Sequence, residues 1–282
     1  MGLGGYLFWT AAAREIKQRT GLKCLPVEAY NNGVIKIIKS EIFKNNPNIS
    51  QFNEDSSITV LPIQLNNPTA NYCKQDTPEK AVHRYDKHVI EQICETYGIH
   101  DPVLKCDLFL TDEEKLFSKK FANELKEKYI TIEPNTKDEY TLNKRYPHDK
   151  WQKIVNDVQN KIKIVQIGVK GSKVLDNVID MTGKTNFREA ASLISRSEFH
   201  VGCEGGLMHA ANSLNKRSVI IFTGFLHPKM TAYPENINIW IGKNHGPCGM
   251  KILCSQCENE AINHDHNEVI RLIETLLKEV IT

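Results

Sequence analysis

Residues 198–224 read EFHVGCEGGLMHAANSLNKRSVIIFTG: an apolar strand, a glycine-rich turn, a short helix and a second apolar strand. A helix between two strands joins them as parallel neighbours in one sheet. The same alternation continues on both sides, with strands predicted at 129–135, 162–169 and 236–242 and helices starting at Lys150, Asn186 and His266. We therefore predict an α/β fold whose parallel sheet carries helices on both faces.

The N-terminal half has a less regular pattern. It opens with the glycine loop MGLGG and a helix that ends at Gly21. Thr111 and Glu114 have the capping-box spacing that starts another helix. We place the domain boundary there, between an abbreviated domain at 1–110 and a second domain at 111–282. Within the first domain we expect strands at 24–30 and 56–65 and helices at 33–44 and 79–97.

The composition is that of an ordinary globular protein, with 40% hydrophobic and 25% charged residues and a net charge of +2 over 282 residues. Basic residues are interleaved with acids, which argues against a nucleic-acid partner. No apolar run approaches the ~20 residues of a membrane span. The eight cysteines are scattered, as free thiols in a reducing compartment would be. We expect a cytoplasmic protein without a membrane span.

Ligands of parallel sheets bind beyond the carboxyl ends of the strands, where helices begin. The stretch GCEGG, residues 202–206, places two glycines at the start of a helix. Because they have no side chains, a phosphate can approach the N–H groups of the first turn, which have no partner in the helix and lie at the positive end of its dipole. Glu204 would repel that phosphate if it pointed the same way, so we expect it to accept hydrogen bonds from hydroxyls. In the alternative interpretation Glu204 only complements the helix dipole and the glycines only form a tight turn.

The segment 180–228 resembles family 9 glycosyltransferases, the ADP-heptose:lipopolysaccharide heptosyltransferases. Upstream, NKRYPHDKW resembles the family pattern Lys-x-Trp-Pro-x-x-x-Trp and places Lys144 on the lysine that meets the donor's phosphates or sugar. The loop EPNTK, which contains Thr136, takes the place of the family's phosphate loop. The other matching positions are Gly183, Lys184, Thr185, Glu204, Gly205, Gly206, Met208, His209, Thr223 and Gly224.

This resemblance implies a GT-B architecture, in which two Rossmann-like domains face each other across a cleft. The C-terminal domain would hold a nucleotide-sugar and the N-terminal domain the acceptor. The implied reaction is inverting, metal-independent and heptosyltransferase-like, with Lys144 and Glu204 as catalytic residues and a glycan or lipid-linked saccharide as acceptor. No cofactor would be required. The implied pathway is the biosynthesis of lipopolysaccharide or another surface glycan, and a lipid-linked acceptor would bring the protein into peripheral contact with a membrane.

The start of the chain departs from the family pattern. Family members have a first strand followed by Leu-Gly-Asp, whose aspartate is the proposed base. This chain begins MGLGGYLF, so Gly5 stands where the aspartate is expected, and Gly4 and Gly5 are assigned to the acceptor side. Other acids near strand ends are Glu28, Asp55 and Asp76. A non-catalytic binding protein for nucleotide-sugars or glycans therefore stays an alternative, and a GT-B sugar-nucleotide epimerase is a further one.

Two other sets of residues raise expectations about packing and metals. Cys248, Cys254 and Cys257 have the spacing Cys-x5-Cys-x2-Cys, with His245, His264 and His266 nearby. We expect reduced thiols in a packed loop, and structural zinc or iron is the alternative. We also expect His209 to hold the loop, Trp151 to lie in the core, Trp9 to line the cleft, and His83 and His88 to lie on a solvated helix face.

Overall fold

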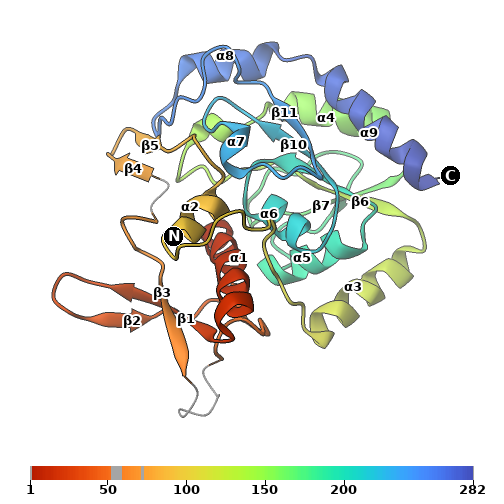
Figure 1. The fold of residues 1–282 in the computed structure, drawn as a ribbon. Helices are drawn as coiled ribbons and strands as arrows, with labels where there is room; N and C mark the ends of the chain where they lie inside the picture. Colours follow the sequence, from red (N-terminus) through yellow and green to blue (C-terminus); the bar gives the residue numbers. More distant parts are fainter. Residues whose placement is uncertain (1, 52–58, 71–72, 282) are drawn as a thin grey trace.

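The computed structural model describes residues 2–51, 59–70 and 73–281. Its largest element is a six-stranded, all-parallel sheet with the strand order β11-β10-β9-β6-β7-β8 (Figure 1). This confirms the predicted α/β fold. The strands are β6 (Tyr129–Glu133), β7 (Lys163–Gln166), β8 (Ile179–Asp180), β9 (His200–Cys203), β10 (Ser218–Phe222) and β11 (Ile237–Trp240).

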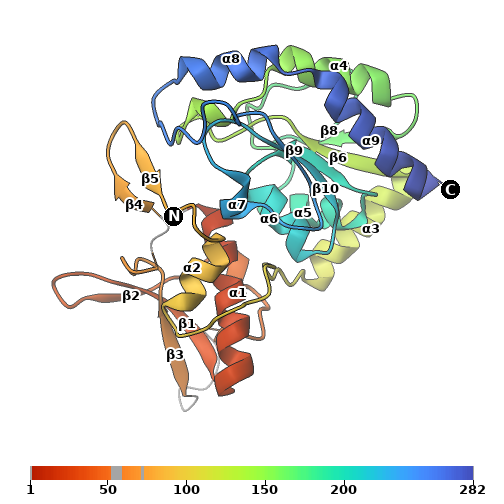
Figure 2. The same cartoon turned by 45° about the horizontal axis from the view of Figure 1, so that its top comes forward.

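Helices cover both faces of this sheet (Figure 2). The β6 side chains alternate, so that Ile130 and Ile132 pack on one face with Trp151, which is fully buried as predicted, and Tyr129 packs on the other. The first face is covered by α4 (His148–Val158), α8 (Ser255–Asn263) and α9 (His266–Ile281). The second is covered by α3 (Asp112–Leu125), α5 (Phe187–Arg196) and α6 (Gly206–Ser213). The predicted capping box starts α3.

The N-terminal lobe contains a small three-stranded sheet with the order β2-β1-β3. β1 pairs with β3 in parallel and with β2 in an antiparallel hairpin. Before β1, the long helix α1 ends at Gly21, whose φ of +75° is the left-handed C-cap conformation. The elements of this lobe are α1 (Leu3–Thr20), β1 (Lys23–Ala29), β2 (Ile35–Ile37), η1 (Glu41–Phe43), β3 (Val60–Gln64), β4 (Cys73–Asp76), β5 (Ala81–His83) and α2 (Val89–Glu95).

One predicted helix of this lobe is wrong, and a second is correct only in its C-terminal half. At 33–44, Gly33 adopts φ +77° and the Tyr30 N–H bonds the Val34 carbonyl, which closes a hairpin turn before β2. At 79–97, the first residues form β5 because the Ala81 N–H bonds the Gly249 carbonyl at 2.8 Å. Only the second half of this segment is helical. Contacts distant in sequence thus override the local periodicity.

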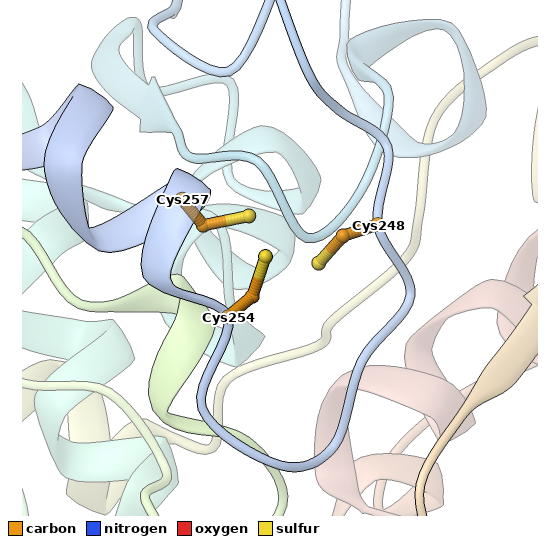
Figure 3. Close-up of side chains that lie close together, drawn as sticks. All are labelled: Cys248, Cys254 and Cys257. Carbon is orange, nitrogen blue, oxygen red and sulfur yellow. The ribbon is translucent and has the colours of Figure 1, made fainter.

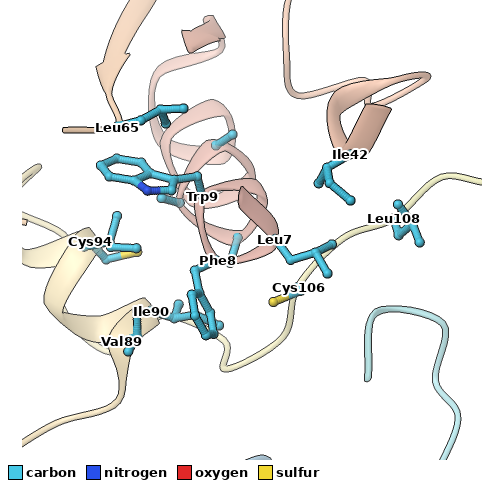
Figure 4. Packing of buried hydrophobic residues seen from close by; sticks show 14 of the residues in the cluster. Leu7, Phe8, Trp9, Ile42, Leu65, Val89, Ile90, Cys94, Cys106 and Leu108 are labelled. Carbon is cyan, nitrogen blue, oxygen red and sulfur yellow. The ribbon is translucent and has the colours of Figure 1, made fainter. Parts of the chain in front are cut away.

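The two lobes share one apolar core. Leu7, Phe8 and Trp9 of α1 are buried among residues of α2 and of the segment 104–108 (Figure 4), in the same cluster as Met208 of α6. Trp9 is only 1% exposed, so the prediction that it lines a cleft is wrong. His83 and His88 are also buried, because His83 lies in β5 and His88 caps α2. Among the described residues, no helix is long and apolar enough to cross a membrane.

Candidate functional site

The start of α6 lies at the carboxyl edge of the parallel sheet, where the sequence placed it. Gly205 is extended and no side chain caps the first N–H groups of the helix. The start of α1 packs directly against it, because a Cβ added to Gly4 would come within 3.1 Å of the Gly206 Cα. The glycines therefore allow two helix N-termini, each without a side-chain cap, to approach each other. Such N-termini favour an anion.

Lys144 and Glu204 form an ion pair beside this helix start. Lys144 ends the short 3-10 helix η2 (Leu142–Lys144), and Glu204 follows β9. The Lys144 and Glu204 side chains are only 18% and 8% exposed, and the ammonium also lies 5.3 Å from the ring centroid of Phe225. The structure thus brings together the two residues predicted to be catalytic, from positions 60 apart in the sequence.

His209 continues the polar chain that begins at this ion pair. Its Nε2 lies 3.8 Å from a Glu204 oxygen, and its Nδ1 lies 2.8 Å from the Tyr233 hydroxyl. The Tyr233 hydroxyl is in turn 3.1 Å from the Cys106 Sγ. Burial lowers the His209 pKa well below its usual value, so the imidazole is neutral. Sequence reasoning missed Tyr233 and Cys106, because no local pattern marks a hydrogen bond between distant segments.

The predicted residues Thr136 and Thr185 each have a buried hydroxyl without a hydrogen-bond partner among the described residues. Buried polar groups are normally paired, so these two point to a bound ligand or water. Gly183, two residues before Thr185, has φ +64°, and its N–H donates a hydrogen bond to the Gly168 carbonyl. Lys184 is exposed and pairs with Asp180 at 3.1 Å.

Three other predicted residues lie behind the site. Met208 is fully buried in the core that both lobes share, and no face of it is exposed. The Thr223 hydroxyl donates to the Asn143 carbonyl at 2.5 Å and so supports the turn that carries Lys144. Gly224 has no room for a side chain, because the Cys257 Sγ occupies the position of its Cβ. The site is therefore supported by three buried residues that need not contact a ligand: Met208, Thr223 and Gly224.

Cys248, Cys254 and Cys257 converge on one point (Figure 3), with all three Sγ atoms within 4.8 Å of one another. Hydrogen bonds from the other thiols lower the pKa of Cys248, whereas that of Cys257 is raised. Three thiols at this spacing fit the ligand chemistry of zinc or iron. Among the described residues no histidine joins the group, and His264 instead bonds Tyr146 and Glu268.

Asn143 connects this thiol cluster to the Lys144 turn. Its amide donates to the carbonyls of Met250 and Ile252 at 2.6 and 2.8 Å, and its oxygen accepts from the Cys254 N–H at 2.8 Å. The side chain is 4% exposed. The cysteine loop and the Lys144 turn are therefore one hydrogen-bonded unit, and no sequence pattern predicts this contact.

Of the acids considered as bases, Glu28 lies away from this site. Glu28 lies on the β1–β2 hairpin, where it accepts a hydrogen bond from the Tyr30 hydroxyl. Asp76 ends β4, and Asp55 lies outside the described residues. Gly4 and Gly5 fall in the first turn of α1, and no described strand precedes this helix.

Two α/β lobes that meet at the carboxyl edge of a parallel sheet constitute the GT-B fold of glycosyltransferases. Within that class, the sequence profile of glycosyltransferase family 9 (heptosyltransferase) matches residues 55–258. The chain belongs to this family and is a heptosyltransferase-like glycosyltransferase. No curated protein is significantly similar to it in sequence.

Solved structures agree with this assignment at the level of the fold. The family 9 glycosyl transferase from Veillonella parvula has a TM-score of 0.67 at 15% identity, over 99% of this chain and 95% of that one. ADP-heptose LPS heptosyltransferase II from E. coli has a TM-score of 0.65 at 13% identity, over 99% and 97%. The dodecameric iron-containing glycosyltransferase TibC of enterotoxigenic E. coli has a TM-score of 0.66 at 16% identity, over 100% and 75%.

Proposed function

We propose that this protein transfers a sugar from a nucleotide-diphosphate-sugar to a glycan or lipid-linked saccharide, with inversion and without a metal ion in the reaction. Residues 111–282 would bind the donor, and residues 1–110, including Gly4 and Gly5, would form the acceptor side. The observation that carries the proposal is the Lys144–Glu204 pair beside the uncapped start of α6.

The chemistry of glycosyl transfer fits this arrangement. Negative charge grows on the diphosphate as the glycosidic bond to it breaks, and the Lys144 ammonium and the N–H groups at Gly205 and Gly206 are donors for that charge. Glu204 forms an ion pair with Lys144, and its carboxylate can still accept a hydrogen bond from a sugar or ribose hydroxyl. Thr136 and Thr185 offer two further hydroxyls, which have no hydrogen-bond partner in the described part of the chain.

Replacing Lys144 by Ala tests the donor site. We expect kcat/KM to fall about 100-fold, because one preorganised cation at the leaving group is removed. The assay measures release of the nucleoside diphosphate from ADP-, GDP- and UDP-sugars with and without acceptor. Lys153→Ala is the matched control, because Lys153 is exposed on α4 and pairs with the exposed Asp149. Unchanged turnover in Lys144→Ala would exclude the proposed role.

A binding protein without transferase activity is the second candidate. It is favoured by Gly5, a residue without an acid group at the position where the resemblance expects the base; the neighbouring Gly4 packs against Gly206 and His209. This candidate predicts that a nucleotide-sugar stabilises the protein against heat but is neither hydrolysed nor transferred. Release of nucleotide that depends on Lys144 would contradict it.

We further propose a structural zinc or iron ion held by Cys248, Cys254 and Cys257. The support is the convergence of the three thiols and the iron-containing relative of the same fold. The ion would cross-link the loop that Asn143 bonds, and it would take no part in the transfer itself.

A further inference from the structure

Glu133 is the last residue of β6 and pairs in register with Gly202 of β9. The two strands are neighbours at the point where the strand order of the sheet reverses, with β7 and β8 on one side and β10 and β11 on the other. Open parallel sheets bind their ligands at this switch point, beyond the carboxyl ends of the strands. Glu133 therefore occupies the position at which a ligand of this sheet is expected.

The side chain of Glu133 lies on the face that α6 covers. Residues in register on parallel neighbours share a face, so Glu133, Gly202 and Ile220 lie on the same side. Ile220 belongs to the core cluster that contains Met208 of α6. Because α6 begins at this edge of the sheet, Glu133 is near its uncapped N-terminus.

Gly202 has no side chain, and this lets the Glu133 side chain and the His200 ring lie close to the β9 backbone. A Cβ at Gly202 would come within 3.6 Å of the Glu133 Cβ and 3.1 Å of the His200 Nε2. That His200 nitrogen is buried and has no hydrogen-bond partner among the described residues.

The Glu133 carboxyl has neither a hydrogen bond nor an ion pair with any described residue. Burial is the one cause of its raised pKa, which is about 8. At neutral pH the group is therefore mostly in its acid form, and an acid carboxyl can donate a hydrogen bond.

The titratable groups around this edge do not compensate a charge on Glu133. His200 faces it across Gly202, and burial lowers the His200 pKa to about 3, so this ring is neutral. Burial likewise raises the pKa of the Cys203 thiol and lowers that of His209. Lys144 pairs with Glu204, Arg188 with Glu114, and Glu189 with the N-cap of α5. Lys137, Lys170 and Lys173 lie in the loops that follow β6 and β7, and none of them offsets the effect of burial on the Glu133 pKa.

We propose that Glu133 is a further donor-binding residue, whose neutral carboxyl donates an O–H hydrogen bond to a phosphate oxygen of the nucleotide-sugar. The inference rests on the proposed donor site at Lys144, Gly205 and Gly206. A carboxylate at this place would repel the diphosphate, whereas a neutral carboxyl adds a hydrogen-bond donor to those of Lys144, Thr136 and Thr185.

The affinity for a nucleotide-sugar as a function of pH tests this role. ADP-, GDP- and UDP-glucose are the probes, since both phosphates are esterified and do not titrate between pH 6 and 9. Isothermal titration of the tightest of the three should show constant affinity below pH 7. Above about pH 8 the affinity should fall toward tenfold per pH unit, because binding requires the protonated carboxyl.

Two substitutions separate hydrogen bonding from charge. Glu133→Gln keeps a neutral donor of the same shape, so its affinity should match that of the wild type at pH 6.5 and lose the decline above pH 8. Glu133→Met has no donor, and we expect affinity about tenfold weaker at every pH. Glu127→Gln is the matched control, because Glu127 precedes the opposite end of β6 and pairs with Lys163 at the surface. It should keep the wild-type pH profile.

Each outcome decides the inference. If Glu133→Gln keeps the alkaline decline, or if its affinity drops at all pH values as expected for a lost carboxylate acceptor, Glu133 does not donate to phosphate. If Lys144→Ala weakens binding while both Glu133 variants bind like the wild type, this inference alone fails. If none of the probes binds, or if Lys144→Ala has no effect, the proposed donor site fails with it.

Discussion

At the scale of single residues, burial decides the charge states of this protein. His88, His200 and His209 are 2%, 0% and 3% exposed, and desolvation lowers the pKa of each. The folded protein therefore holds three neutral imidazoles. Their sequence contexts are unremarkable, and His88 was assigned to a solvated face, because only the packed structure shows which rings lose water.

Because these three histidines are neutral in the folded protein, we expect the folded state to become less stable as the pH falls. Below the unfolded value of about 6.5 the unfolded chain takes up protons that the folded chain excludes. The free energy of unfolding is therefore highest above that pH. On acidification it decreases by about 1.4 kcal/mol per pH unit for each histidine. For His200 the loss should continue to its folded pKa of about 3.

Replacing His200 by Gln should reduce the dependence of the free energy of unfolding on pH by the contribution of one histidine, about 1.4 kcal/mol per pH unit. The measurement is the free energy of unfolding by urea between pH 7 and 5, in wild type and variant. His100→Gln is the control, because His100 is exposed. Equal slopes in wild type and His200→Gln would show that His200 does not titrate as described.

At the scale of elements, the cysteine loop and the Lys144 turn form one unit. Asn143 bonds Met250, Ile252 and Cys254, and the Thr223 hydroxyl holds the Asn143 carbonyl from the end of β10. Sequence spacing indicated the three cysteines but could not show that their loop contacts the turn carrying Lys144. The reason is that the contact joins segments more than 100 residues apart.

Metal removal tests the cysteine loop. We expect the purified protein to contain about one zinc or iron ion per chain by elemental analysis. Cys254→Ser should abolish the metal and lower the melting temperature, because the cross-link between the loop and α8 is lost. Cys94→Ala is the control, since Cys94 lies in the core of the N-terminal lobe, outside the cluster. Metal at trace levels in the wild type would exclude the ion.

At the scale of the whole molecule, the lobes are joined by a shared core and by Arg188. This side chain is 2% exposed and forms a two-bond ion pair with Glu114, at 2.7 and 2.9 Å. It also donates to the carbonyls of Glu41 and Phe109, which belong to the N-terminal lobe and to the connection between the lobes. We therefore expect both lobes to unfold in one cooperative transition.

Arg188→Met should destabilise the protein by about 3–5 kcal/mol, because it leaves the Glu114 carboxylate without its buried partner. Thermal unfolding monitored by calorimetry and by near-UV circular dichroism would measure the loss. Arg217→Met is the control, as Arg217 forms an exposed pair with Glu279. A variant with the melting temperature of the wild type would mean that the buried pair contributes little.

The sequence by itself determined the parallel sheet, its helices, the family and the glycine-opened start of α6. Those features depend on local periodicity, on capping residues such as Thr111, and on short motifs such as GCEGG, all of which are local in the chain. The N-terminal lobe was harder to predict, because β2 and β5 depend on partners rather than on their own pattern.

Only the tertiary structure decided which of these residues meet. It paired Lys144 with Glu204, placed Met208 inside the core and set the first turn of α1 against Gly206. It also left the carboxyl of Glu133 at the switch point without a partner among the residues that the structure describes. The physical reason is the same in each case. Burial and charge compensation are properties of surroundings assembled from distant segments, and no local pattern in the chain encodes them.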